Sequence, residues 1–191
     1  MKRAVTFGRF NFLSKGHEAF FEAILNEWDS LTVIVLDDIR SMGNCIETRK
    51  NTNFYDMCDS NWKSNMLSFS DRLEAMYVWK LNSPNSNRIE VSQFPRVEYF
   101  PDIFNNVYKA EEYDIVCSKD DSNTFDKVKV KEFESILNRK VYTVEPMFIL
   151  HNQTIIQGEN NIENLECFFD KYVLDYYIRK GVIGKLWQSR K

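Results

Sequence analysis

The chain has 191 residues, of which 43% are hydrophobic and 15% aromatic, and its formal net charge is −3. This length predicts a single domain over 1–191, and the acidic balance argues against a nucleic-acid partner. Four cysteines without C-x-x-C spacing and only two histidines argue against a structural zinc site. With no membrane-spanning apolar run and no signal peptide, we expect a cytoplasmic protein with reduced thiols, no membrane partner and no protein-held metal.

The N-terminal part predicts a β-α-β unit. Residues 4–7 form a short apolar run, residues 18–25 carry apolar side chains on one helical face, and residues 31–36 form a continuous β-branched run. A continuous run of this kind is typical of a strand buried on both faces of a parallel sheet. Asp38 closes the run.

The stretch 39–67 has no clear periodicity and leaves two interpretations open. It is rich in Asn, Ser and Asp and contains Tyr55 and Trp62. A long loop in a compact domain is usually functional or disordered. It is therefore either a surface insertion with some local helix, or a lid in which Trp62 or Tyr55 stacks on a heterocycle.

The remaining elements alternate between helix and strand. Ser68 or Ser70 caps a helix whose apolar side is expected at Leu73, Met76, Tyr77 and Leu81. The further segments are a strand at 88–92, a helix at 103–110, a strand at 114–117, a helix at 128–137, a strand at 140–144, two short extended pieces within 147–156, and a C-terminal helical segment at about 162–187. About five strands alternating with helices predict an α/β fold, a doubly wound, Rossmann-like parallel sheet with helices on both faces.

The segment from Gly8 to His17 lies between the first predicted strand and helix. Its glycines allow the backbone to approach a ligand closely, and a helix N-terminus favours phosphate. The spacing resembles the HxGH nucleotidylyltransferase superfamily, with matches at Gly8, Phe10, Gly16 and His17. Phe12 stands where the family has proline, and Ser14 stands where the family has the first histidine or a threonine. The C-terminal segment 173–183 also resembles the last helix of these enzymes.

The resemblance implies nucleotidyl transfer from a nucleoside triphosphate to a small phosphorylated acceptor, with release of pyrophosphate. ATP as donor and nicotinamide mononucleotide as acceptor are favoured, and cytidylyl transfer comes second. Mg²⁺ is expected with the triphosphate, held mainly by phosphate and water. The implied site residues are His17, Ser14 and Lys15 for catalysis; Gly8, Arg9, Phe10, Gly16, Ser118, Asp120 and Gly158 for nucleotide binding; and Asp38, Trp62 and Arg72 for substrate binding.

A second phosphate-binding motif of the superfamily is degenerate in this sequence. The best candidate is 156–162, where Gln157 replaces serine, Glu159 replaces threonine and Ile162 replaces the phosphate-binding arginine. A carboxylate has the wrong charge for meeting phosphate. The alternative hypothesis is therefore a catalytically impaired nucleotide-binding or protein-interaction module on the same fold. The sequence leaves open whether the chain forms a homo-oligomer.

Overall fold

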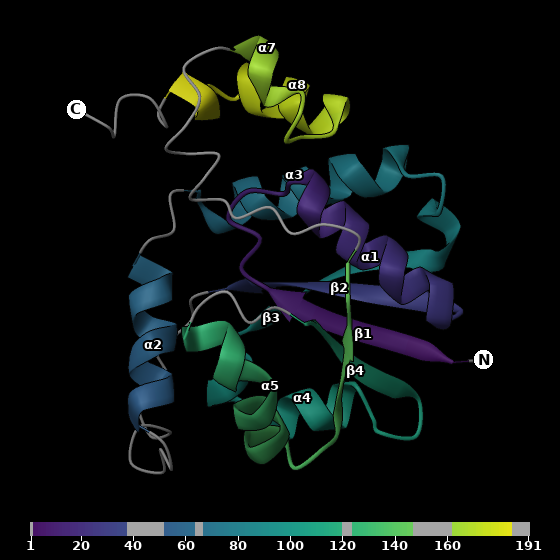
Figure 1. Cartoon of the computed structure of the whole chain (residues 1–191), viewed down its shortest axis with the longest axis vertical. Coiled ribbons are helices and arrows are strands. Elements are labelled where there is room, and N and C mark those ends of the chain that lie inside the picture. The colour runs from purple at the N-terminus through teal and green to yellow at the C-terminus, as the bar shows by residue number, and fades with distance from the viewer. Residues whose placement is uncertain (1, 38–51, 64–66, 120–123, 147–161, 185–191) are drawn as a thin grey trace.

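A parallel sheet forms the centre of the molecule (Figure 1). The structure, a computed structural model, describes residues 2–37, 52–63, 67–119, 124–146 and 162–184. Within these residues the five strands are β1 (Arg3–Gly8), β2 (Ser30–Asp37), β3 (Ile89–Pro95), β4 (Tyr113–Ser118) and β5 (Val141–Val144). Their order is β3-β2-β1-β4-β5 and all neighbouring pairs are parallel. The predicted Rossmann-like fold is confirmed, and the order reverses between β1 and β4.

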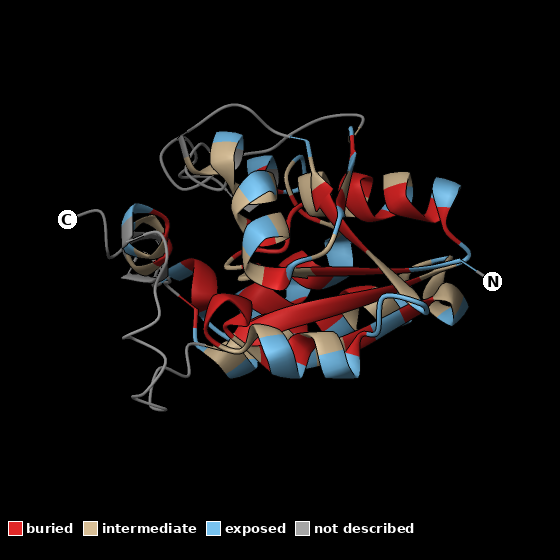
Figure 2. Ribbon diagram, turned by 90° about the horizontal axis from the view of Figure 1, so that it is seen from below, coloured by how far each residue is buried: buried red, intermediate tan, exposed pale blue. Residues whose placement is uncertain are grey.

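Helices cover both faces of the sheet (Figures 1 and 2). On one side lie α1 (Lys15–Glu27) and α3 (Phe69–Asn82), with α8 (Lys171–Arg179) packed on α3. On the other lie α2 (Thr52–Lys63), α4 (Pro101–Val107) and α5 (Thr124–Leu137). The short elements are the 3-10 turns η2 (Ser86–Arg88) and η3 (Val97–Tyr99) and the helix α7 (Ile162–Leu165).

Alternation along each strand divides the apolar side chains between two cores. Ala4 and Val33 belong to the core under α1 and α3, whereas Val5 and Ile34 belong to the core over α4 and α5. Successive strand residues point to opposite faces, so a strand covered on both faces must be apolar throughout. This explains the continuous run at 31–36.

Helix α3 begins as predicted, but its buried side differs from the prediction. The Ser68 hydroxyl accepts the backbone N–H of Asp71 at 3.1 Å, which caps the helix. Tyr77 and Leu81, expected on the apolar side, are 42% and 75% exposed. The buried stripe consists of Arg72, Ala75, Met76 and Trp79. This i, i+3, i+4, i+7 set includes an arginine, which an apolar pattern alone misses.

The C-terminal segment predicted as helical contains two separate helices, α7 and α8. Asp170 caps α8 by accepting the N–H groups of Tyr172 and Val173. Gly181 follows the helix with φ of +67°, a left-handed conformation that favours glycine and is typical of a residue just after a helix end. The extended pieces predicted within 147–156 lie outside the described residues. No helix in the described ranges has the length and apolar character needed to cross a membrane.

Candidate functional site

A cavity of about 290 Å³ opens at the carboxyl ends of the strands. Its lining comes from β1 and the loop that follows it, from β2 and β4, and from α1, α2, η3 and α5. It includes Gly8, Ser118, His17, Cys58, Glu98 and Lys129. In open α/β sheets, ligands bind in the crevice outside the carboxyl ends, at the point where strand order reverses. The cavity occupies this position, and its volume is near the lower end for small-molecule sites.

His17 lines this cavity from the first turn of α1. Its Nδ1 accepts the backbone N–H of Ser14 at 3.2 Å. Since Nδ1 is thereby an acceptor, the neutral ring carries its proton on Nε2. Burial lowers the pKa of His17 from 6.5 to about 4, so the ring is neutral near pH 7. The side chain can therefore donate one hydrogen bond to an anionic ligand through Nε2.

Ser14 and Lys15 lie at the start of α1 but differ from His17 in their surroundings. The Ser14 side chain is fully buried, and its Oγ lies 3.1 Å from His17 Nδ1. Lys15 Nζ donates to the backbone oxygen of Glu166 at 2.6 Å, toward the C-terminal helices. Neither residue lines the cavity. In this arrangement Ser14 orients the imidazole, and the predicted direct contact of Ser14 and Lys15 with ligand stays a prediction.

Glu18 follows His17 and contributes a second perturbed group to this helix start. Burial, reinforced by the charge of Asp170, raises the pKa of Glu18 from 4.5 to about 7, while Lys15 opposes the shift. Neighbouring side chains of α1 are thus shifted in opposite directions by the same cause. Burial disfavours the charged form of both an acid and a base.

The loop after β1 is held by aromatic packing. Phe10 has φ of +44°, a left-handed conformation that is uncommon for a bulky residue. Its ring lies against His17 at 5.4 Å between centroids, and a Cβ on Gly8 would come within 3.0 Å of the ring. Glycine at position 8 therefore leaves the space that Phe10 fills. The Tyr177 hydroxyl accepts the N–H of Leu13 at 2.9 Å, which ties the loop to α8.

The described lining of the cavity includes the cationic side chains of Arg9 and Lys129. Arg9 belongs to the loop after β1, and Lys129 belongs to α5. Lys129 Nζ donates to Ser118 Oγ at 3.1 Å, which places this ammonium at the end of β4. The structure thus brings Gly8, Arg9, Phe10, His17 and Ser118 of the predicted set together at one cavity.

Arg72 is only 3% exposed and does not line the cavity. Its Nη1 donates to the backbone oxygens of Arg9 at 2.6 Å and of Leu36 at 2.9 Å. The guanidinium therefore joins the loop after β1 to the end of β2. This geometry supports the position of Arg9, and a direct contact of Arg72 with substrate stays a prediction.

Several cavity residues were missed by the sequence analysis. They are Cys58, Glu98, Cys117, Phe125, Lys129 and Phe133. Helix α5 begins at Thr124, four positions before the predicted start, so Phe125 enters the site with the helix. The spacing Phe125–Lys129–Phe133 was the available signal, because residues four apart share one helical face. Glu98 had no signal, since it follows β3 in a short 3-10 turn.

Of the remaining predicted site residues, four lie wholly or partly outside the described residues and one, Gly16, lies in α1. Asp38, Asp120 and Gly158 lie outside the described residues. Trp62 belongs to α2, but its side chain is likewise outside the description. Gly16 lies in the first turn of α1. Among the residues that the structure describes, no group of three His, Cys, Asp or Glu side chains could hold a metal ion.

No protein-family model matches the chain, and no curated protein sequence matches it either. Solved structures do match. The Plasmodium falciparum nicotinic acid mononucleotide adenylyltransferase complexed with NaAD has a TM-score of 0.54 at 14% identity, covering 95% of this chain and 97% of that one. The same enzyme complexed with APC has a TM-score of 0.56 at 12% identity, covering 94% and 96%.

A bifunctional NMN adenylyltransferase/ADP ribose pyrophosphatase from Francisella tularensis has a TM-score of 0.59 at 14% identity. The match covers 98% of this chain and 51% of that protein, so this chain spans about half of its length. At such identities the likeness establishes a shared fold. The chain has the fold of mononucleotide adenylyltransferases, and fold alone does not determine activity.

Proposed function

We propose that this protein transfers an adenylyl group from ATP to a pyridine mononucleotide such as nicotinamide mononucleotide, releasing pyrophosphate. The observation that carries the proposal is the position of His17, a neutral Nε2–H donor on the first turn of α1, in the cavity at the carboxyl edge of the sheet. The shared fold with nicotinic acid mononucleotide and NMN adenylyltransferases supports the reaction class.

In the proposed reaction an oxygen of the acceptor's phosphate attacks the α-phosphorus of ATP. The new phosphorus–oxygen bond forms as the bond to the β-phosphate oxygen breaks, and pyrophosphate leaves with the electron pair. The protein has to align the two phosphates and stabilise the charge that develops on them. Nε2 of His17 would donate to an α-phosphate oxygen, and the backbone N–H groups at the start of α1 would add to it.

The imidazole of His17 and the backbone N–H groups are neutral donors, so Arg9 and Lys129 would supply the positive charge that the phosphates need. Both line the cavity, and Lys129 is held at the end of β4 through Ser118. We expect Mg²⁺ to arrive with the triphosphate and to be held by phosphate oxygens and water.

The test is pyrophosphate release from ATP and nicotinamide mononucleotide, measured for the parent chain and for His17→Ala. Removing one donor to a developing oxyanion costs about 100- to 1,000-fold in turnover, and we expect a loss of that size. Asn26→Ala, an exposed position on the same helix, is the matched control and should retain the parent rate. Equal turnover of parent and His17→Ala would show that the site is misassigned.

One sequence observation favours a second function. The candidate C-terminal phosphate motif has Glu159 and Ile162 where the superfamily has threonine and arginine. Losing a clamp on the leaving group would leave a nucleotide-binding module with impaired catalysis. Calorimetry separates the two: ATP binding with pyrophosphate release supports the enzyme, and ATP binding without release over a panel of phosphorylated acceptors supports the module.

A further inference from the structure

A buried carboxylate faces the cavity at the end away from α1. Glu98 lies in η3, directly after β3, and is only 4% exposed, yet it is part of the cavity lining. A buried ionised carboxylate is costly unless it is paired and hydrogen-bonded. The question is therefore which groups pair with the Glu98 carboxylate and donate hydrogen bonds to it.

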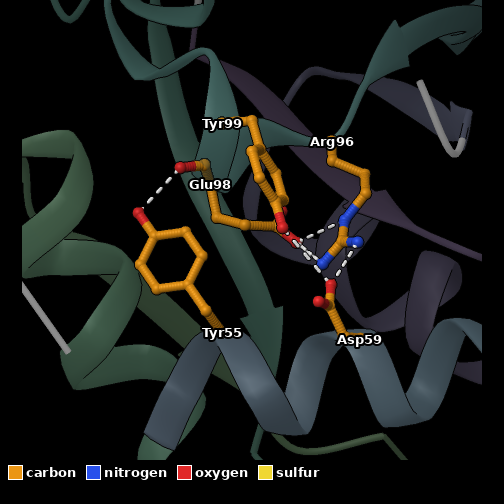
Figure 3. Close-up of polar contacts among 5 residues, drawn as sticks. All are labelled: Tyr55, Asp59, Arg96, Glu98 and Tyr99. Atoms are coloured by element: carbon orange, nitrogen blue, oxygen red, sulfur yellow. Dashed lines mark hydrogen bonds and ion pairs between the residues drawn. The ribbon is translucent and has the colours of Figure 1, made fainter. Parts of the chain in front are cut away.

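Glu98 is held by a network of charged and phenolic groups (Figure 3). Arg96, which is fully buried, donates from Nε to Glu98 Oε1 at 2.7 Å and from Nη1 to Asp59 at 2.6 Å. Tyr55 donates to the backbone oxygen of Glu98 at 2.9 Å, and Tyr99 donates to Asp59 at 3.3 Å. Because both its carboxylate and its backbone are held, Glu98 presents a fixed acceptor.

The pKa values of Arg96 and Cys58 are shifted by their neighbours in this network. Burial would lower the pKa of Arg96, but Glu98 and Asp59 outweigh it and the pKa rises, so the guanidinium stays charged. The Cys58 thiol hydrogen-bonds to Glu98, and burial together with this carboxylate raises the pKa of Cys58. A carboxylate offers about four lone-pair sites, so these partners leave room for a donor from a ligand.

The cavity therefore has two chemically different ends. Toward α1 it carries His17 and Arg9, which suit phosphate. Toward the opposite core it carries Glu98 together with the aromatic rings of Phe7, Phe125 and Phe133. Lys129 lies on the same helix as the last two rings, and its ammonium donates to Ser118 Oγ at 3.1 Å, at the end of β4. Aromatic rings beside a hydrogen-bond acceptor suit a flat heterocycle that bears an N–H donor.

Resting on the proposed function, we propose that Glu98 makes the acceptor site selective for a pyridine mononucleotide that carries a carboxamide rather than a carboxylate. A carboxamide N–H can donate to the Glu98 carboxylate. A ligand carboxylate in the same place would put two anions in contact, and such like-charge contacts discriminate strongly against the wrong partner. Arg96 and Asp59 act as positioning residues that hold Glu98 in place.

The experiment compares binding of nicotinamide mononucleotide and nicotinic acid mononucleotide to the full chain by calorimetry. A hydrogen bond to a charged group predicts that the parent chain binds the amide about 10- to 100-fold more tightly. Glu98→Gln, whose amide can both donate and accept, should reduce that ratio at least about tenfold by improving binding of the carboxylate. Glu90→Gln, an exposed position on β3, is the matched control and should leave the ratio unchanged.

Equal or tighter binding of the carboxylate by the parent chain would overturn the proposal, and this measurement needs no variant. A folded Glu98→Gln chain that keeps the parent ratio would overturn it as well, as would binding of neither mononucleotide. Selective amide binding without pyrophosphate release would contradict the adenylyl-transfer proposal and leave the role of Glu98 supported. If the chain binds both mononucleotides equally and releases pyrophosphate equally well with each, the selectivity proposal is contradicted and the adenylyl-transfer proposal stands.

Discussion

Replacing Arg72 by methionine separates a supporting role from direct contact with substrate. The guanidinium is almost completely buried and donates to the backbone oxygens of Arg9 and Leu36 at 2.6 and 2.9 Å. Methionine has a similar length but no donor, so it would leave two carbonyl groups at the end of β2 and in the adjacent loop without this partner. The expected consequence is a loss of folding stability.

The magnitude follows from these two bonds. A hydrogen bond to a charged group contributes about 1.5–3 kcal/mol, so losing two should lower the free energy of unfolding by about 3–6 kcal/mol. This is a large part of the 5–15 kcal/mol that holds a typical domain together. With a denaturant slope of about 2 kcal/mol per molar urea, the unfolding midpoint should fall by about 1.5–3 M.

The assay is equilibrium urea unfolding followed by circular dichroism. Arg179→Met is the matched control, because Arg179 is exposed on α8 and donates at 3.3 Å to the carbonyl of Asp175 within its own helix. The control midpoint should move by less than about 0.5 M. A midpoint of Arg72→Met equal to that of the parent, with a large loss of acceptor binding, would refute the supporting role and restore Arg72 as a substrate ligand.

Two further predictions concern side chains that line the cavity. Because the pKa of His17 is lowered from 6.5 to about 4, the unfolded chain binds its proton first, and this residue's contribution to stability should be lost as the pH falls from 6.5 toward 4. Glu18, with a pKa raised to about 7, contributes stability that is lost as the pH rises from 4.5 toward 7. Because parent and His17→Gln both contain Glu18, the difference between their unfolding free energies, measured across pH 4–7, isolates the contribution of His17. A difference that does not vary with pH would contradict a desolvated, neutral imidazole. Lys129→Met should lower kcat/KM for ATP about 10- to 100-fold. Lys131→Met, at an exposed position on the same helix, is the control and should change kcat/KM less than about twofold. Equal effects of the two substitutions would show that Lys129 does not contact ATP.

Periodicity predicted the sheet and most helices because both cores are built from regular alternation. The run at 31–36 is apolar throughout, and it forms β2, which is buried on both faces. The helix from 68 onward was placed correctly by its cap at Ser68. Its buried side was predicted wrongly at Tyr77 and Leu81, because the stripe facing the sheet includes the charged Arg72. Arg72 can be buried because its guanidinium donates to the backbone oxygens of Arg9 and Leu36, and periodicity does not reveal these partners.

The site could be predicted only where local spacing determines it. The turn from Gly8 to His17 places a helix N-terminus and an imidazole at the carboxyl edge, and this follows from strand–turn–helix order. Glu98 and Lys129 come from separate segments that meet only after the sheet has formed. The burial of Ser14 under His17 is likewise a tertiary result, and the sequence suggested a ligand contact in its place.

The most direct test of the central claim is product analysis. The parent chain is incubated with Mg²⁺, ATP and nicotinamide mononucleotide, and the products are identified by mass spectrometry while released pyrophosphate is quantified. We predict the adenylated dinucleotide and pyrophosphate in equal amounts, with both lost in His17→Ala. Binding of ATP without either product, over both pyridine mononucleotides, would contradict adenylyl transfer at this cavity.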